Sequence, residues 1–157
     1  MNSTAASAGG ATRPALIEFL ALRPLARLQP LLLLGLRLYL AQVFILSGLT
    51  KLRDWDTTLL LFSNEYHVPL LPPAVAAVAG TFGETVLPLL LVPGLLGRFA
   101  AMGLFVVNAV AVASYPDLTD VQRQVHYFWG ALIAVLALFG PGSISVDARL
   151  RPPLTTP

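Results

Sequence analysis

Residues 74–96 read AVAAVAGTFGETVLPLLLVPGLL and carry a single ionisable group, Glu84, near the middle of the run. The run is long enough to cross a hydrocarbon core about 30 Å thick. A charged side chain at the centre of a bilayer costs about 2.5–3.5 kcal/mol on insertion scales. We therefore expect Glu84 to be paired, protonated or hydrated, and we expect its partner to constrain the helices around it.

The composition of the whole chain also indicates a membrane protein. Its 157 residues are 56% hydrophobic and 11% charged, with a mean hydropathy of +0.75, whereas about a quarter of the residues in a soluble domain are charged. The net charge of +2 is too small to indicate a nucleic-acid partner. The chain has no cysteine, so redox chemistry would need a bound cofactor or a partner protein.

Three further apolar runs, residues 31–52, 98–115 and 125–139, have lengths suited to membrane spans. Four spans predict an all-α integral membrane four-helix bundle. A cleaved signal peptide is the rival interpretation of the first run, but this run contains Arg37 and has no clear cleavage site.

Boundary signals support these limits. Pro72 and Pro73 precede the second span, and Gly140-Pro141-Gly142 follows the fourth. Pro88 and Pro93 should kink the second span, and a tight turn at Gly97 should join it to the third.

The segments outside the spans divide the chain into a tail with an interfacial segment (residues 1–30), a membrane domain (31–149) and a second tail (150–157). We expect residues 1–12 and 150–157 to be disordered and residues 14–30 to form a short amphipathic helix in the membrane interface. The first loop, residues 53–73, should contain another short helix capped by Asp54 or Asp56. Its apolar face would be formed by Trp55, Leu59, Phe62 and Tyr66.

The distribution of basic residues predicts the orientation. Six lie on the side of both termini (Arg13, Arg23, Arg27, Arg98, Arg149 and Arg151), and three lie on the other side (Lys51, Arg53 and Arg123). The positive-inside rule then places both termini in the cytoplasm and the first loop outside.

Glu84, Arg37 and Lys51 are the candidate functional residues. Counting depth along the spans places Arg37 near Glu84, so we expect these two to pair, whereas Lys51 should extend outward to the membrane surface. Two interpretations remain open: a buried structural clamp between helices, or a proton relay or quinone head-group site.

His67 and His126 are the only histidines, and together with Glu65 they could hold copper or another metal. They lie on separate elements without a ligand spacing that links them. Solvation or a local hydrogen bond is the alternative role for each.

Four motifs in order resemble the DoxX family of four-helix membrane proteins. They are LRLYLAQVFILSGLTKL (36–52), GTFGETVLP (80–88), GLLGRFAAMGLF (94–105) and GPGSISVD (140–147). The family pattern has an Arg that opens the first span, a Gly-x-x-Lys that closes it and a Glu in the second; these correspond to Arg37, Gly48 to Lys51, and Glu84.

Residues 47–73 are similar to one branch of this family, which accompanies copper-binding ribosomal peptides and their maturation enzymes. The resemblance implies an inner-membrane accessory protein in copper-peptide maturation, metal stress or a redox process, with membrane or periplasmic partners from a shared operon. Other members resemble subunits of quinol oxidases. A non-enzymatic scaffold that docks periplasmic partners through residues 53–73, and a proton-coupled exporter that would need to form a homo-oligomer, are alternatives.

Overall fold

The computed structural model describes residues 12–150, with side chains from residue 26 onward, and every element in that range is a helix. The helices are α1 (Thr12–Arg53), α2 (Trp55–Asn64), α3 (Pro73–Leu91), α4 (Gly97–Ser114), α5 (Asp120–Phe139) and α6 (Val146–Leu150). The predicted all-α class is confirmed.

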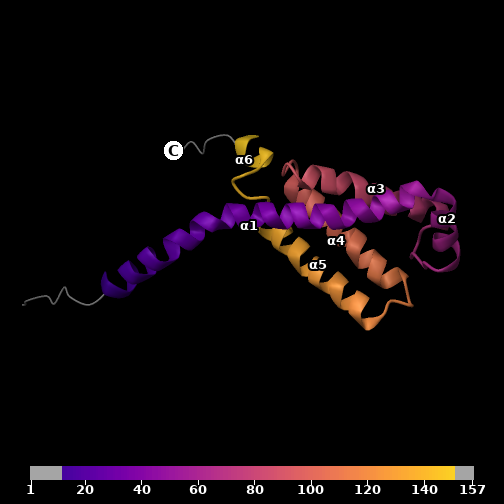
Figure 1. Cartoon of the computed structure of the whole chain (residues 1–157), viewed down its shortest axis with the longest axis horizontal. Helices are drawn as coiled ribbons and strands as arrows, with labels where there is room; N and C mark the ends of the chain where they lie inside the picture. Colours follow the sequence, from indigo (N-terminus) through magenta and orange to yellow (C-terminus); the bar gives the residue numbers. More distant parts are fainter. Residues whose placement is uncertain (1–11, 151–157) are drawn as a thin grey trace, which may run out of the picture.

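The four long helices form a closed bundle. Helix α1 packs against α3, α3 against α4, α4 against α5, and α5 returns to α1 (Figure 1). Each helix contributes side chains to one apolar core, formed by Leu33, Leu40 and Phe44 of α1, Leu91 of α3, Ala100, Ala101 and Leu104 of α4, and Ile133 and Leu136 of α5.

Three of the described helices are long and apolar enough to cross a membrane: residues Ala26–Arg53 of α1, α3 and α4. Their outward surfaces are also apolar, with exposed side chains such as Phe82, Phe99 and Val106. Because the surface of a soluble protein would carry many charges here, this pattern indicates contact with lipid. The molecule is therefore a helical membrane bundle.

Helix α5 begins earlier than the predicted fourth span, which started at residue 125. Thr119 and Gln122 form a reciprocal capping box that starts the helix at Asp120. The helix ends at Phe139, and Gly140 follows with a φ of +82°, so the predicted stop signal is confirmed.

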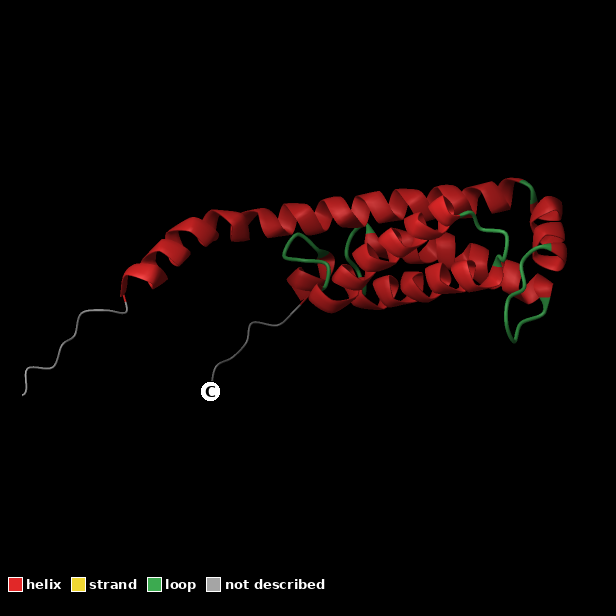
Figure 2. Ribbon diagram, turned by 90° about the horizontal axis from the view of Figure 1, so that it is seen from below, coloured by secondary structure: helices red, strands yellow, loops and turns green. Residues whose placement is uncertain are grey.

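The segment at residues 14–30 is not a separate helix. It is the N-terminal part of α1, which continues without a break into the bundle and extends beyond it as a curved rod (Figures 1 and 2). Prolines within a helix can be accommodated as a bend rather than a break. The expectation of disorder concerns mainly residues 1–11 and 151–157, which lie outside the described residues.

Helix α3 begins at Pro73, one residue before the predicted start at Ala74, but ends at Leu91, before the expected limit at residue 96. Pro93 has no N–H to continue the hydrogen-bond ladder, and its ring would clash with the preceding turn. Gly94 and Leu96 then adopt positive φ values of 68° and 49°, which reverse the chain before α4 begins at Gly97. Pro88 is thus the proline inside α3, and Pro93 belongs to the turn.

The predicted helix in the first loop is confirmed as α2. The carboxylate of Asp54 accepts a hydrogen bond from the Thr57 amide at 3.0 Å and caps the helix. Its predicted apolar face packs against the first turns of α3, where Phe62 contacts Ala76 and Ala77. Helix α2 therefore covers the end of α3 that projects past α1.

Candidate functional site

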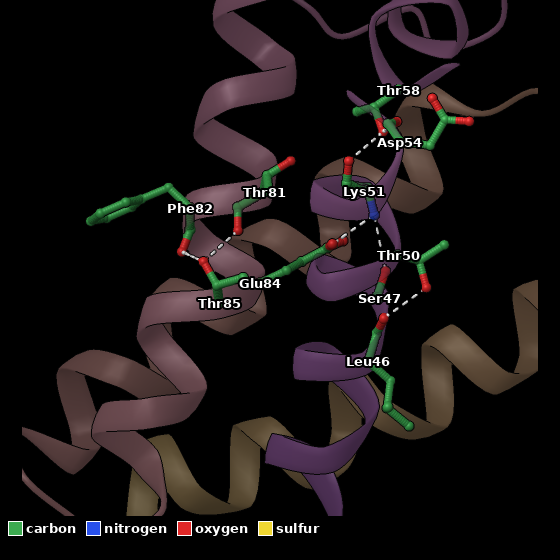
Figure 3. A network of polar contacts seen from close by, with 10 residues as sticks. All are labelled: Leu46, Ser47, Thr50, Lys51, Asp54, Thr58, Thr81, Phe82, Glu84 and Thr85. Carbon is green, nitrogen blue, oxygen red and sulfur yellow. Dashed lines mark hydrogen bonds and ion pairs between the residues drawn. The ribbon is translucent and has the colours of Figure 1, made fainter. Parts of the chain in front are cut away.

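Glu84 is paired with Lys51 and not with Arg37. Lys51 Nζ donates hydrogen bonds to Glu84 Oε2 at 2.6 Å and to Ser47 Oγ at 2.9 Å (Figure 3). The two charged side chains are 19% and 11% exposed, so the ion pair lies inside the bundle but is not sealed. The predicted partner of Glu84 was wrong, as was the prediction that Lys51 extends outward.

The relative level of α1 and α3 explains this difference. A Cβ atom added to Gly48 would lie 3.2 Å from the backbone carbon of Glu84 and 2.6 Å from Thr85 Cγ2. Gly48 therefore lies beside Glu84, and Lys51, one turn further along α1, is within reach of its carboxylate. The depth count aligned the ends of the two spans, whereas the first turns of α3 extend past α1 and pack on α2.

Arg37 is fully buried at the opposite end of the bundle, where it binds backbone carbonyls. Its Nη1 donates to Val92 O at 3.1 Å, and its Nη2 donates to Ile144 O. Carbonyl groups at the end of α3 and in the following loops have no partner within a helix, so a guanidinium with several donors can satisfy them. Arg37 joins α1 to the end of α3 and to the C-terminal segment.

The Gly-Pro-Gly-x-x-Ser-x-Asp segment completes this end. The carboxylate of Asp147 accepts hydrogen bonds from the backbone amides of Leu96 and Gly97, at 2.8 and 2.7 Å, and so caps α4. The Asp147 and Val146 amides donate to the carbonyls of Gly94 and Pro93. The motif that signals a helix stop in the sequence is therefore also the N-terminal cap of a different helix.

A cavity of about 340 Å³ lies beside the Lys51–Glu84 pair. Every helix from α1 to α5 contributes to its wall, which is mostly apolar. The polar lining residues are Ser47, Lys51, Tyr66, Glu84, Ser114, Tyr115 and His126, and the apolar ones include Ala79, Val106, Val107 and Val110. A volume in this range is typical of small-molecule sites, and such sites combine apolar walls with a few polar groups.

Several polar groups on the cavity wall are available to a ligand. Among the described residues, Glu84 Oε1 has no hydrogen-bond partner, and Lys51 uses two of its three N–H groups. Ser114 is 3% exposed, and its hydroxyl is buried with no partner among the described residues. Burial raises the pKa of Tyr66, with further contributions from Tyr115, Glu65 and Glu84, so its hydroxyl remains protonated.

His126 and His67 make different local contacts. His126 Nδ1 lies 2.9 Å from Asn108 Oδ1, and His126 lines the cavity. His67 Nδ1 lies 3.0 Å from the Glu65 carbonyl, at a smaller neighbouring pocket. Within the described part of the chain, no three His, Cys, Asp or Glu side chains gather in a way that could hold a metal ion.

The sequence contained signals for some of these contacts. Ser47, Gly48 and Lys51 share one face of α1, and the spacing Gly-x-x-Lys places a close helix contact one turn before the cation. The contributions of Ser114 and Tyr115 to the cavity, and the carbonyl partners of Arg37, depend on packing between distant segments and have no local signal.

Comparison with known proteins agrees with this architecture. The DoxX family profile matches residues 32–117, from the bundle part of α1 through α4. The inner membrane protein YphA of Escherichia coli strain K12 is 31% identical over 132 residues, which cover 77% of this chain and 91% of that protein. No solved structure matches the chain. The matched region contains Arg37, Lys51 and Glu84, and the chain belongs to the DoxX family.

Proposed function

We propose that this chain is a bacterial inner-membrane accessory protein that binds a quinone-type ring in the cavity beside Lys51 and Glu84. The observation that carries the proposal is an ion pair with unused hydrogen-bonding capacity on the wall of a mostly apolar cavity. A quinone carbonyl can accept from Lys51, and a quinol hydroxyl can donate to Glu84 Oε1.

The wall of the cavity also suits a molecule that arrives through the lipid. Ala79 on α3 and Val106 and Val110 on α4 line the cavity and are also exposed on the outside of the bundle. In a membrane those positions face acyl chains, so a ring with an apolar tail can enter without crossing water. The inner-membrane location is supported by the name of the relative in Escherichia coli.

The proposed topology has four spans, with α5 as the fourth, and both termini in the cytoplasm. Six basic residues on the side of the termini against three on the other support this orientation. The cavity then lies in the outer half of the bilayer and α2 faces the periplasm. Reporter fusions after Asn64 and at the C-terminus would give opposite signals in this topology, and equal signals would contradict it.

The test of ligand binding uses purified full-length protein in lipid nanodiscs and a photoreactive quinone. We expect labelling of α3 and α4 residues that line the cavity, competed by unmodified quinone. Glu84→Gln should reduce labelling while the protein remains at normal levels in the membrane. Asp117→Asn, which changes an exposed acid outside the cavity, is the matched control. Labelling that is reduced neither by Glu84→Gln nor by unmodified quinone would contradict the proposal.

We propose that the protein supports one of three physiological processes: redox balance, the response to metal stress, or the maturation of a copper-binding peptide. The resemblance of residues 47–73 to the copper-peptide branch supports the last of these. A subunit role beside a quinol oxidase is the alternative within the same chemistry. Deletion of the gene in its native host, with growth compared under copper excess and under oxidative stress, separates these processes.

A scaffold is the second candidate, and one observation favours it. Leu60 on α2 and Leu70 in the loop before α3 are exposed, and Leu70 adopts a positive φ of 65°. Exposed leucines at the end of the bundle can dock a partner protein or its peptide. Replacement of Leu60 and Leu70 by serine should then abolish the function of the protein in its native host, whereas Glu84→Gln should have little effect on that function.

A further inference from the structure

The contact between Asn108 and His126 fixes which ring nitrogen of His126 carries a proton. Asn108 Nδ2 donates to the backbone carbonyl of His126 at 2.9 Å, and a carbonyl can only accept. The amide oxygen of Asn108 therefore faces His126 Nδ1, at 2.9 Å, and Nδ1 must be the donor. In the neutral ring the other nitrogen, Nε2, is then left with a free lone pair.

His126 occupies a wall of the same cavity as the ion pair, but on a different helix. Lys51 and Glu84 come from α1 and α3, whereas His126 comes from α5. Trp129 holds the imidazole in an edge-on contact, with ring centroids 5.1 Å apart. No described residue forms a hydrogen bond with Nε2, so this nitrogen is free to accept one from a ligand in the cavity that His126 lines.

We propose that His126 Nε2 accepts a hydrogen bond from a ring hydroxyl of the bound molecule, so that the cavity selects hydroxylated aromatic rings. Asn108 is the positioning residue, because it orients the imidazole and sets its tautomer. The proposal deepens the proposed function: for a quinone and quinol pair, it assigns the reduced form as the tighter ligand. It concerns binding only and requires no transfer of electrons.

Two probes that differ in one hydrogen-bond donor test this assignment. 4-Octylphenol carries a ring hydroxyl, and its methyl ether, 4-octylanisole, does not. With the full-length protein in nanodiscs, we expect the phenol to bind about tenfold more tightly than the ether, as for one hydrogen bond to a buried acceptor. The fluorescence of Trp129, which contacts His126, reports binding of either probe.

Substitutions at the two histidines provide a matched comparison. His126→Phe keeps an aromatic ring of similar size but no acceptor, so the tenfold preference should disappear while the ether binds as before. His67→Phe changes the other histidine, which does not line this cavity, and should leave the preference intact. Equal binding of both probes to the unmodified protein, or a preference that survives His126→Phe, would overturn the assignment.

Variants of Asn108 test the tautomer separately and do not alter the imidazole. Asn108→Asp loses the donor to the His126 carbonyl but keeps the acceptor for Nδ1–H, so it should retain the preference, whereas Asn108→Leu loses both and should reduce it. Nitrogen-15 NMR of labelled histidine should show an unprotonated Nε2 in the unmodified protein and a mixture of tautomers in Asn108→Leu. A protonated Nε2 in the neutral ring of the unmodified protein would overturn the assignment without any ligand.

The results also separate this inference from the proposed function. If the photoreactive quinone labels the cavity but the phenol and the ether bind equally, the quinone site is supported and the proposed role of His126 is refuted. If the phenol binds more tightly through His126 but no quinone binds, the role of His126 as acceptor for a ring hydroxyl is supported and the proposed quinone function is refuted.

Discussion

Lys51 reaches across the interface between α1 and α3 and places its ammonium nitrogen 2.6 Å from the carboxylate of Glu84. Both charged groups are mostly buried, and because their charges are opposite, each reduces the free-energy cost of burying the other. Glu84 is the acid that the sequence marks as exceptional, and its partner Lys51 lies in the last turn of α1, the helix that also carries Arg37.

A double-mutant cycle tests the pairing. Lys51→Met leaves the Glu84 carboxylate without a counterion and should destabilise the protein by about 3 kcal/mol, the usual cost of breaking a buried pair. Lys51→Met combined with Glu84→Leu should recover most of that loss. Thermal unfolding of the purified protein in nanodiscs gives the four stabilities. The corresponding cycle for Arg37 and Glu84 should be additive, and strong coupling there would contradict the observed pairing.

Gly48 should be intolerant of a side chain. The Cβ of Gly48→Ala would lie 2.6 Å from Thr85 Cγ2 and 3.2 Å from the Glu84 backbone carbon, so the Thr85 side chain or the two helices must shift, and overpacking of this kind costs about 1–3 kcal/mol. Gly35 on the same helix is the control, because a Cβ there meets nothing within 4 Å and alanine should be neutral or slightly stabilising. Chemical cross-linking between cysteines placed on α1 and α3 measures the separation. Equal tolerance at both glycines would contradict the close contact.

Asp147 should contribute to stability through its cap on α4. Asp147→Ala removes the acceptors of the Leu96 and Gly97 amides and should destabilise the protein by about 1–2 kcal/mol. Asp147→Asn retains one acceptor oxygen and should cost less. Thermal unfolding of these variants provides the measurement, with Asp117→Ala as an exposed control. A loss in Asp117→Ala as large as in Asp147→Ala would show that the cap is not the cause.

The cap of α2 should respond to acid. Hydrogen bonds from the Thr57 side chain and then from its backbone amide hold the pKa of Asp54 below its ordinary value of 3.8. Because the folded-state pKa is the lower one, the contribution of the cap is complete above the unfolded-state pKa and is lost as the pH falls through the folded-state pKa. Hydrogen exchange in α2 should therefore show reduced protection at about pH 3 relative to neutral pH.

Asp54→Asn separates titration from capping. Asparagine is also a good N-cap residue but does not ionise in this range, so the protection of α2 should no longer depend on acid. An acid response that is unchanged in this variant would assign the effect to another group.

Local signals in the sequence predicted the helix boundaries set by Pro72-Pro73 and Gly140, and the apolar face of α2, because capping and periodicity involve neighbouring residues. The end of α3 was misplaced because Pro93 is compatible with either a kink or a stop. The partner of Glu84 was misassigned because the relative level of two helices is set by a contact at Gly48, and a count of residues along separate spans contains no information about that contact.

The carbonyl contacts of Arg37 have a consequence for biosynthesis. Its partner Ile144 is separated from it by 107 residues, so at ordinary elongation rates of about 5–20 residues per second the cation waits roughly 5–20 seconds for that carbonyl to be made. During this interval the Val92 carbonyl can bind one side of the guanidinium, and headgroup phosphates, water or the insertion machinery must solvate the other. The closed bundle can therefore form only after residue 144 has been made, and removal of residues 140–147 would leave part of the Arg37 guanidinium without its carbonyl partner between the helices.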